Sequence, residues 1–119
     1  MSKNMSSQFY RVKNSGDMIR LSVKIGHGQK AVTRVYLGEN QIGPEKFDSF
    51  AGLEIGKDNE LKNRTLRCAT TVHDINPATD MTSITAELAG GVKDFSKTMS
   101  DTVDESGGVI FYDFFFDFI

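Results

Sequence analysis

Tryptophan is absent from this 119-residue chain, and cysteine, histidine and proline are rare. The single cysteine, Cys68, has no partner for an internal disulfide, which excludes the class of small secreted domains held together by disulfides. One cysteine and two histidines also fall short of the four ligands of a structural zinc site. We therefore expect a hydrophobic core to hold the fold, without a metal or another cofactor.

Long apolar runs and an excess of one charge are also missing. No stretch approaches the ~20 apolar residues of a membrane-spanning helix, and the start, MSKNMSSQFY, lacks the apolar segment of a secretory signal peptide. The formal net charge is only -2, and the basic residues are spread singly, whereas nucleic-acid-binding domains concentrate them on one face. These absences predict a cytoplasmic protein with neither membrane insertion nor nucleic-acid binding.

The chain does contain segments in which apolar residues recur at every second position. Such alternation runs from Met18 to Ile25 and again from Ala31 to Leu37. Period two is typical of a half-buried strand, because successive side chains of a strand point to opposite faces. The Gly-His-Gly turn between the two segments favours their pairing as a hairpin.

The second half of the chain repeats this pattern. Residues 64–74 and 81–89 alternate in the same way around an Asn-Pro turn, which favours a second hairpin. Shorter strands are expected at residues 9–12 and 53–55, and the last strand runs from residue 107 to the end.

Two segments allow more than one interpretation. Residues 44–50 begin with proline and fit either a single helical turn or a loop that plugs one end of the core. Residues 92–103 have apolar side chains at helical spacing, but their serines and threonines are indifferent helix formers and form the polar side of a strand. We favour the strand for residues 92–103.

Together these segments amount to about seven to nine short strands separated by turns, which is typical of an all-β antiparallel sandwich. A compact barrel is the alternative architecture. We find no linker that would divide the chain, and we expect one domain over residues 1–119, with residues 1–7 as a flexible N-terminal arm.

The chain ends in VIFYDFFFDFI, residues 109–119, which contains five of the nine phenylalanines. Alternation divides this segment into two faces. The face predicted to enter the core consists of Ile110, Tyr112, Phe114, Phe116 and Phe118. The opposite face consists of Val109, Phe111, Asp113, Phe115, Asp117 and Ile119.

The opposite face is the candidate binding site. Asp113 and Asp117 indicate that this face meets water, yet Phe111, Phe115 and Ile119 expose more apolar surface on it than a monomer usually leaves uncovered. We expect another protein, or a second copy of the chain, to cover these five residues. The alternative is that a loop or the N-terminal arm lies over them.

No combination of residues indicates catalysis. A nucleophile needs a base within hydrogen-bond reach, but Cys68 lies five positions before His73, which places the two on opposite faces of one strand. We therefore predict a non-enzymatic protein that acts as a structural subunit or adaptor of a larger assembly.

A second functional class rests on the polar loops. Asp58 and the stretch from Asp74 to Asp80 offer oxygen ligands of the kind that calcium prefers, and sandwich domains can gather such ligands at one end. The alternative function is therefore a binding module for calcium or carbohydrate that acts through these loops.

Overall fold

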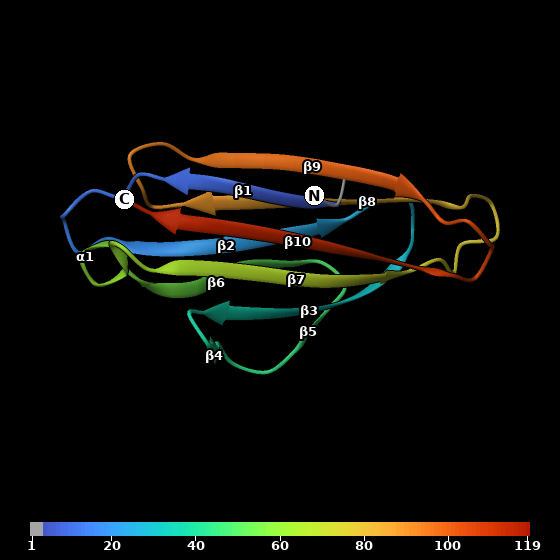
Figure 1. Ribbon diagram of the computed structural model, residues 1–119, viewed down its shortest axis with the longest axis horizontal. Coiled ribbons are helices and arrows are strands. Elements are labelled where there is room, and N and C mark those ends of the chain that lie inside the picture. The colour runs from blue at the N-terminus through green and yellow to red at the C-terminus, as the bar shows by residue number, and fades with distance from the viewer. Residues whose placement is uncertain (1–3) are drawn as a thin grey trace.

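The computed structural model describes residues 4–119, which form two packed β-sheets (Figure 1). The predicted sandwich is confirmed, and the two separate sheets exclude the compact barrel. The elements in chain order are β1 (Met5–Tyr10), β2 (Met18–Ile25), β3 (Lys30–Leu37), β4 (Asn40–Gln41), β5 (Lys46–Phe47), β6 (Phe50–Lys57), α1 (Asp58–Leu61), β7 (Thr65–His73), β8 (Met81–Ala89), β9 (Phe95–Thr102) and β10 (Val109–Phe118). Over residues 4–119 no helix has the length and apolar character needed to cross a membrane.

The larger sheet has the strand order β1-β10-β7-β3-β4, and β5 also pairs with β3. The smaller sheet has the order β6-β2-β8-β9. Strand pairs are antiparallel except for β1 and β10, which run parallel. The last strand of the chain therefore lies inside the larger sheet, between the first strand and β7.

The core lies between the two sheets and follows the predicted alternation. Ile19, Leu21 and Val23 of β2 are fully buried. On β10 the side chains from Tyr112 to Phe118 that were predicted to face inward are buried, and Ile110 packs against the same core at its margin. The side-chain register predicted for the last strand is therefore confirmed.

Both predicted hairpins are wrong. β2 pairs with β6 and β8, whereas β3 pairs with β7, so the turn between β2 and β3 crosses from one sheet to the other. The connection from β7 to β8 also crosses between the sheets. Alternation requires only that each strand bury one face, and a sandwich meets this requirement whether two consecutive strands are neighbours or face each other across the core.

Gln29, a residue that no pattern singled out, connects these two crossing loops. Its side chain is buried, and its Nε2 donates hydrogen bonds to Oδ1 of Asp74 at 3.0 Å and to the carbonyl of Met81 at 2.9 Å. Its Oε1 accepts hydrogen bonds from the backbone N–H groups of Ile75 and Asn76, at 2.8 and 2.9 Å. One amide group thus satisfies polar groups from both ends of the β7–β8 loop.

The beginning of the chain differs from the expectation of an arm. Residues 5–7 belong to β1, which pairs with β10 over its whole length, while residues 1–3 lie outside the described residues. The expected strand at residues 9–12 begins earlier and ends at Tyr10. Pairing with β10 satisfies backbone groups that a free arm would leave to water.

The two ambiguous segments are also decided. The strand favoured within residues 92–103 is confirmed as β9. Residues 44–50 form neither a helical turn nor a plug, because Lys46 and Phe47 pair with β3 as β5 and the Phe47 side chain is 68% exposed. The segment expected as a strand at residues 53–55 is the middle of the longer β6.

Candidate functional site

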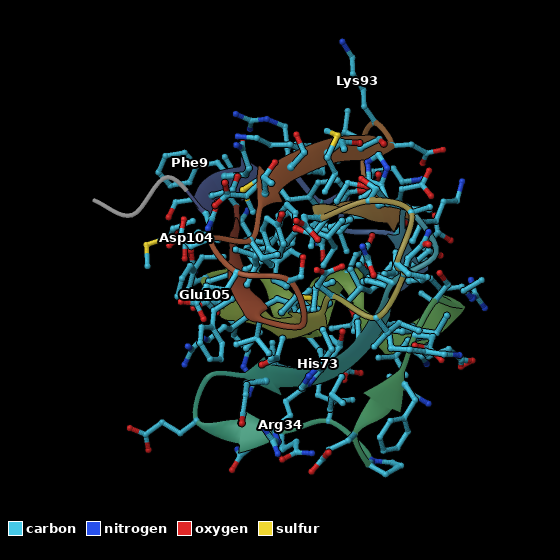
Figure 2. The ribbon with its side chains drawn as sticks, turned by 90° about the vertical axis from the view of Figure 1, so that its right-hand side faces the viewer. Phe9, Arg34, His73, Lys93, Asp104 and Glu105 are labelled. Atoms are coloured by element: carbon cyan, nitrogen blue, oxygen red, sulfur yellow. The ribbon has the colours of Figure 1, made fainter. Side chains whose placement is uncertain are left out.

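The two outer faces of the sandwich differ in chemistry. Along β2, β8 and β9 the smaller sheet presents mainly charged, serine and threonine side chains to solvent, among them Ser22, Lys24, Thr85, Ser96, Thr98 and Ser100. The larger sheet instead presents phenylalanine. Phe9, Phe47 and Phe111 lie on its outer face and are 73%, 68% and 67% exposed. Figure 2 shows Phe9 projecting from one side of the sandwich. We call the outer face of the larger sheet the aromatic face.

One row of side chains on the aromatic face runs across four strands. Phe111 on β10 pairs with Thr71 on β7, Thr71 pairs with Val32 on β3, and Val32 pairs with Phe47 on β5. Neighbouring strands lie about 4.8 Å apart, so the two phenylalanines are about 14 Å apart across the sheet. This row carries no charge and ends in an exposed ring on each side.

A second row, four residues further along the strands, consists of Phe115, Arg67 and Tyr36. The guanidinium of Arg67 lies 5.4 Å from the centre of the Phe115 ring and 6.0 Å from that of Tyr36. It also donates hydrogen bonds of 2.9 and 3.1 Å to the carboxylate of Asp113. These hydrogen bonds raise the pKa of Arg67. Phe115 is therefore half-buried beneath a paired cation, and this row is less apolar than the row of Phe111.

The five predicted site residues are placed as follows. Phe111 is the most exposed of them, while Phe115, Asp113, Asp117 and Ile119 are half-buried. Asp117 accepts a hydrogen bond of 2.5 Å from the hydroxyl of Thr65. The backbone of Ile119 extends the pairing with the first strand, since its N–H donates to the carbonyl of Tyr10 at 3.0 Å. The five residues thus share one face but differ in what they offer a partner.

The aromatic face is wider than the sequence indicated. Phe9 and Phe47 belong to it, although they lie far from Phe111 in the chain and come from β1 and β5. Sequence reasoning missed them because only strand pairing brings them to this face. The N-terminal segment pairs beside β10 in the same sheet, so residues 5–10 do not lie over the face.

The polar loops of the alternative function do not meet. Asp58 is the first residue of α1, which precedes β7, whereas Asp74 to Asp80 follow the end of β7. Figure 1 shows α1 and the β7–β8 loop at opposite ends of the sandwich. The nine residues of β7 separate the two loops by about 30 Å. Within residues 4–119 no three or more His, Cys, Asp or Glu side chains are grouped so that they could hold a metal ion.

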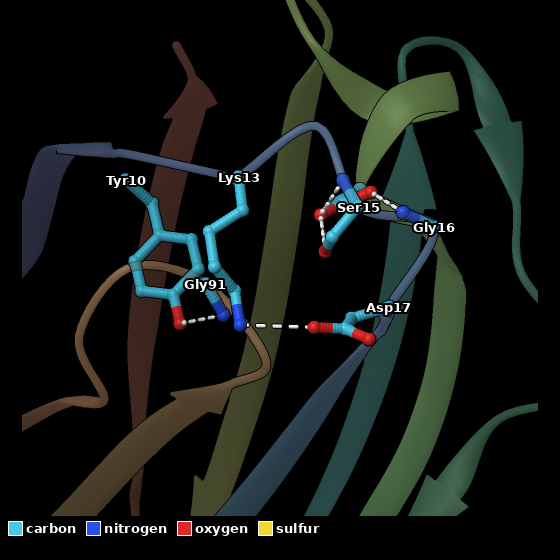
Figure 3. A network of polar contacts seen from close by, with 7 residues as sticks. Tyr10, Lys13, Ser15, Gly16, Asp17 and Gly91 are labelled. Carbon is cyan, nitrogen blue, oxygen red and sulfur yellow. Dashed lines mark hydrogen bonds and ion pairs between the residues drawn. The ribbon is translucent and has the colours of Figure 1, made fainter.

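The carboxylate of Asp58 has a structural role, because it binds the loop between β1 and β2. Figure 3 shows Ser15 and Gly16 of this loop. The carboxylate accepts hydrogen bonds from the N–H and the hydroxyl of Ser15, at 3.1 and 2.8 Å, and from the N–H of Gly16 at 2.7 Å. Burial of Asp58 raises the pKa of its carboxyl, but these hydrogen bonds outweigh burial and hold the pKa below its usual value. Asp58 therefore serves as an anionic anchor for the loop.

Cys68 and His73 lie on opposite faces of β7, as predicted. The thiol of Cys68 is fully buried in the core, and burial raises its pKa to about 12. His73 is exposed on the aromatic face. A thiol that remains protonated at neutral pH is a poor nucleophile.

The aromatic face can offer a partner flat apolar rings together with charges that are already paired. Besides Arg67 and Asp113, the ion pairs of Lys30 with Asp48 and of Arg34 with Glu45 lie on β3 and the loop beside it. No protein-family model, curated protein or solved structure matches this chain. The functional interpretation therefore rests on the chemistry of the two outer faces.

Proposed function

We propose that the protein is a non-enzymatic binding module that contacts another protein through its aromatic face, as a structural subunit or adaptor of a larger assembly. The observation that carries this proposal is the contrast between the two outer faces. Three phenylalanine side chains, each at least two-thirds exposed, share the outer face of the larger sheet, while the outer face of the smaller sheet is mainly polar. Complete burial of a phenylalanine contributes about 1.5–3 kcal/mol, so a partner that covers them gains substantial binding energy.

The chemistry of the face also indicates the kind of partner. The row from Phe111 to Phe47 is uncharged, and Arg67 is already paired with Asp113. A partner with an apolar or aromatic contact surface and a polar rim fits this face, because it can bury the rings without leaving a charge unpaired. The buried, unreactive Cys68 is compatible with the cytoplasmic location that we propose for the complex.

The experiment compares three immobilised forms of the full chain: the native protein, Phe111→Asp, and the control Ser100→Asp. Ser100 is exposed on the smaller sheet, so the control places the same charge on the opposite face. Proteins captured from an extract of the source cells are quantified by mass spectrometry, and the affinity of each purified candidate is measured by calorimetry. We expect a partner that binds the native protein and the control equally and binds Phe111→Asp about tenfold or more weakly, a loss of about 1.4 kcal/mol.

The proposal fails if Phe111→Asp binds every purified candidate as tightly as the native protein does. It also fails if the control loses binding to the same extent, because the smaller sheet would then be the contact surface. Thermal unfolding of both variants checks that each remains folded, as expected for substitutions of exposed side chains.

A further inference from the structure

β1 differs from the other edge strands of the sandwich. An edge strand exposes unpaired backbone N–H and C=O groups, and proteins usually protect such edges with charges, irregularities or short length. β6 has two register shifts against β2, and β4 and β5 are two residues long. β9 has Lys97 and Asp101 on its inward side, opposite Ala86 and Thr82. β1, with the sequence MSSQFY, has no charge, proline or glycine.

The free edge of β1 can be assigned from its pairing with β10. The carbonyls of Asn4 and Tyr10 accept hydrogen bonds from β10 and Ile119, each 3.0 Å long. In a parallel pair, every second residue of a strand directs both its N–H and its C=O group to the same neighbouring strand. The even-numbered residues of β1 therefore form the hydrogen bonds to β10. The N–H and C=O groups of Met5, Ser7 and Phe9 therefore point to the other edge, where no strand of the described chain pairs with them.

We propose that a second copy of the chain binds this edge, with β1 antiparallel to β1 about a two-fold axis at Ser7. Met5, Ser7 and Phe9 are symmetric about that axis. Ser7 then lies opposite Ser7 of the second copy, and Met5 lies opposite Phe9. Every free N–H and C=O group of these three residues gains a partner, because residues of this parity form the hydrogen-bonded pairs of an antiparallel ladder.

The side chains favour a second copy as the occupant. β1 itself is uncharged, so the pairing of Met5, Ser7 and Phe9 brings no charges together, and a two-fold interface needs a surface that complements itself. The Phe9 ring, 73% exposed, would gain a contact with the thioether of Met5. A groove of about 430 Å³, lined by residues 9–11 and 92–95, opens beside the end of β1 that would receive Met5 of the second copy.

The consequence is a continuous sheet through both copies, with the two aromatic faces side by side. This inference concerns the edge of the sheet, and it does not depend on what binds the aromatic face. In such a dimer the row of Phe111 from each copy lies on the same side of the continuous sheet, where a partner can contact both rows.

The test uses the charge of residue 7. Sedimentation equilibrium over a concentration series measures dimerisation of the native full chain, of Ser7→Lys, of Ser7→Asp, of their equimolar mixture and of the control Ser100→Lys. Because like charges directly opposite each other destabilise a strand pair, we expect each Ser7 variant alone to dimerise about fivefold or more weakly. The mixture should restore dimerisation, because lysine then faces aspartate, and the control should dimerise like the native chain.

Several results would overturn the edge dimer. A native chain that stays monomeric over the whole series excludes it, as does a dimer that neither Ser7 variant weakens. Weakening by both variants without restoration in the mixture means that residue 7 does not face residue 7. Phe111→Asp should leave the dimer intact, and loss of the dimer in that variant alone would assign self-association to the aromatic face instead.

Discussion

Arg67 on β7 holds Asp113 on β10 through two hydrogen bonds, 2.9 Å from Nε and 3.1 Å from Nη2, on the outer face of the larger sheet. The same guanidinium lies over the ring of Phe115, 5.4 Å from its centre. This geometry keeps a charge pair and an aromatic ring in one compact unit in the middle of the aromatic face. Phe111, two residues before Asp113, has no such cover and remains 67% exposed.

The unit around Arg67 depends on the planar guanidinium. Lysine cannot donate two parallel hydrogen bonds or stack on the Phe115 ring, so Arg67→Lys should lower the free energy of unfolding by about 0.5–1 kcal/mol. The effect is small because 45% of the Arg67 side chain is exposed to solvent. Urea unfolding measures it, and a double-mutant cycle of Arg67→Ala with Asp113→Ala isolates the pair. A coupling energy of zero would show that the ion pair contributes nothing to stability.

The two faces of β10 should respond differently to substitution. Phe116 is fully buried, with ring centres 5.4 Å from Phe95 and 6.1 Å from Phe114. Phe116→Ala should therefore cost about 3–5 kcal/mol of stability, enough to threaten folding. Phe115→Asp should leave the fold intact, because aspartate at that position is accessible to water and lies opposite Arg67. Thermal unfolding compares the stability of the two variants. If Phe116→Ala left the stability unchanged while Phe115→Asp unfolded the protein, the side-chain register would be contradicted.

Asp58 should make stability depend on pH in the acid range. Its folded-state pKa is lowered, so its contribution is fully present above the unfolded pKa of about 3.9 and is lost as pH falls through the folded pKa. The difference in unfolding free energy between the native chain and Asp58→Asn should be constant near neutrality and should shrink in acid. Urea unfolding at a series of pH values measures it.

Asp104→Asn is the matched control for Asp58, because Asp104 is an exposed carboxylate outside the loop of Ser15 and Gly16. An equal acid dependence for both variants would argue against the anchoring role of Asp58.

Cys68 should be inert in the folded protein. Burial raises the pKa of its thiol to about 12, and thiol reagents attack the thiolate. We expect no labelling by a thiol reagent at neutral or mildly alkaline pH, and complete labelling once the chain is unfolded in denaturant. Absorbance of the released thiolate reports the reaction. Rapid labelling under native conditions would mean that the core around β7 opens far more readily than the packing indicates.

The sequence alone was sufficient to predict which side of each main strand faces the core. Ile19, Leu21 and Val23 alternate with polar residues, and burial of the apolar side is the dominant favourable term in folding. The same argument separated Phe116 from Phe115 within the last strand. A period of two needs only local spacing, so these assignments required no knowledge of which strands are neighbours.

Tertiary structure alone decided which strands pair. Turn residues between β2 and β3 suggested a hairpin, yet β2 pairs with β6 and β8, because a crossing between the sheets buries the same apolar sides equally well. For the same reason the sequence could identify Phe111, Phe115 and Ile119 but could not place Phe9 and Phe47 beside them. The width of the aromatic face and the free edge of β1 are properties of strand order, which depends on contacts between residues far apart in the chain.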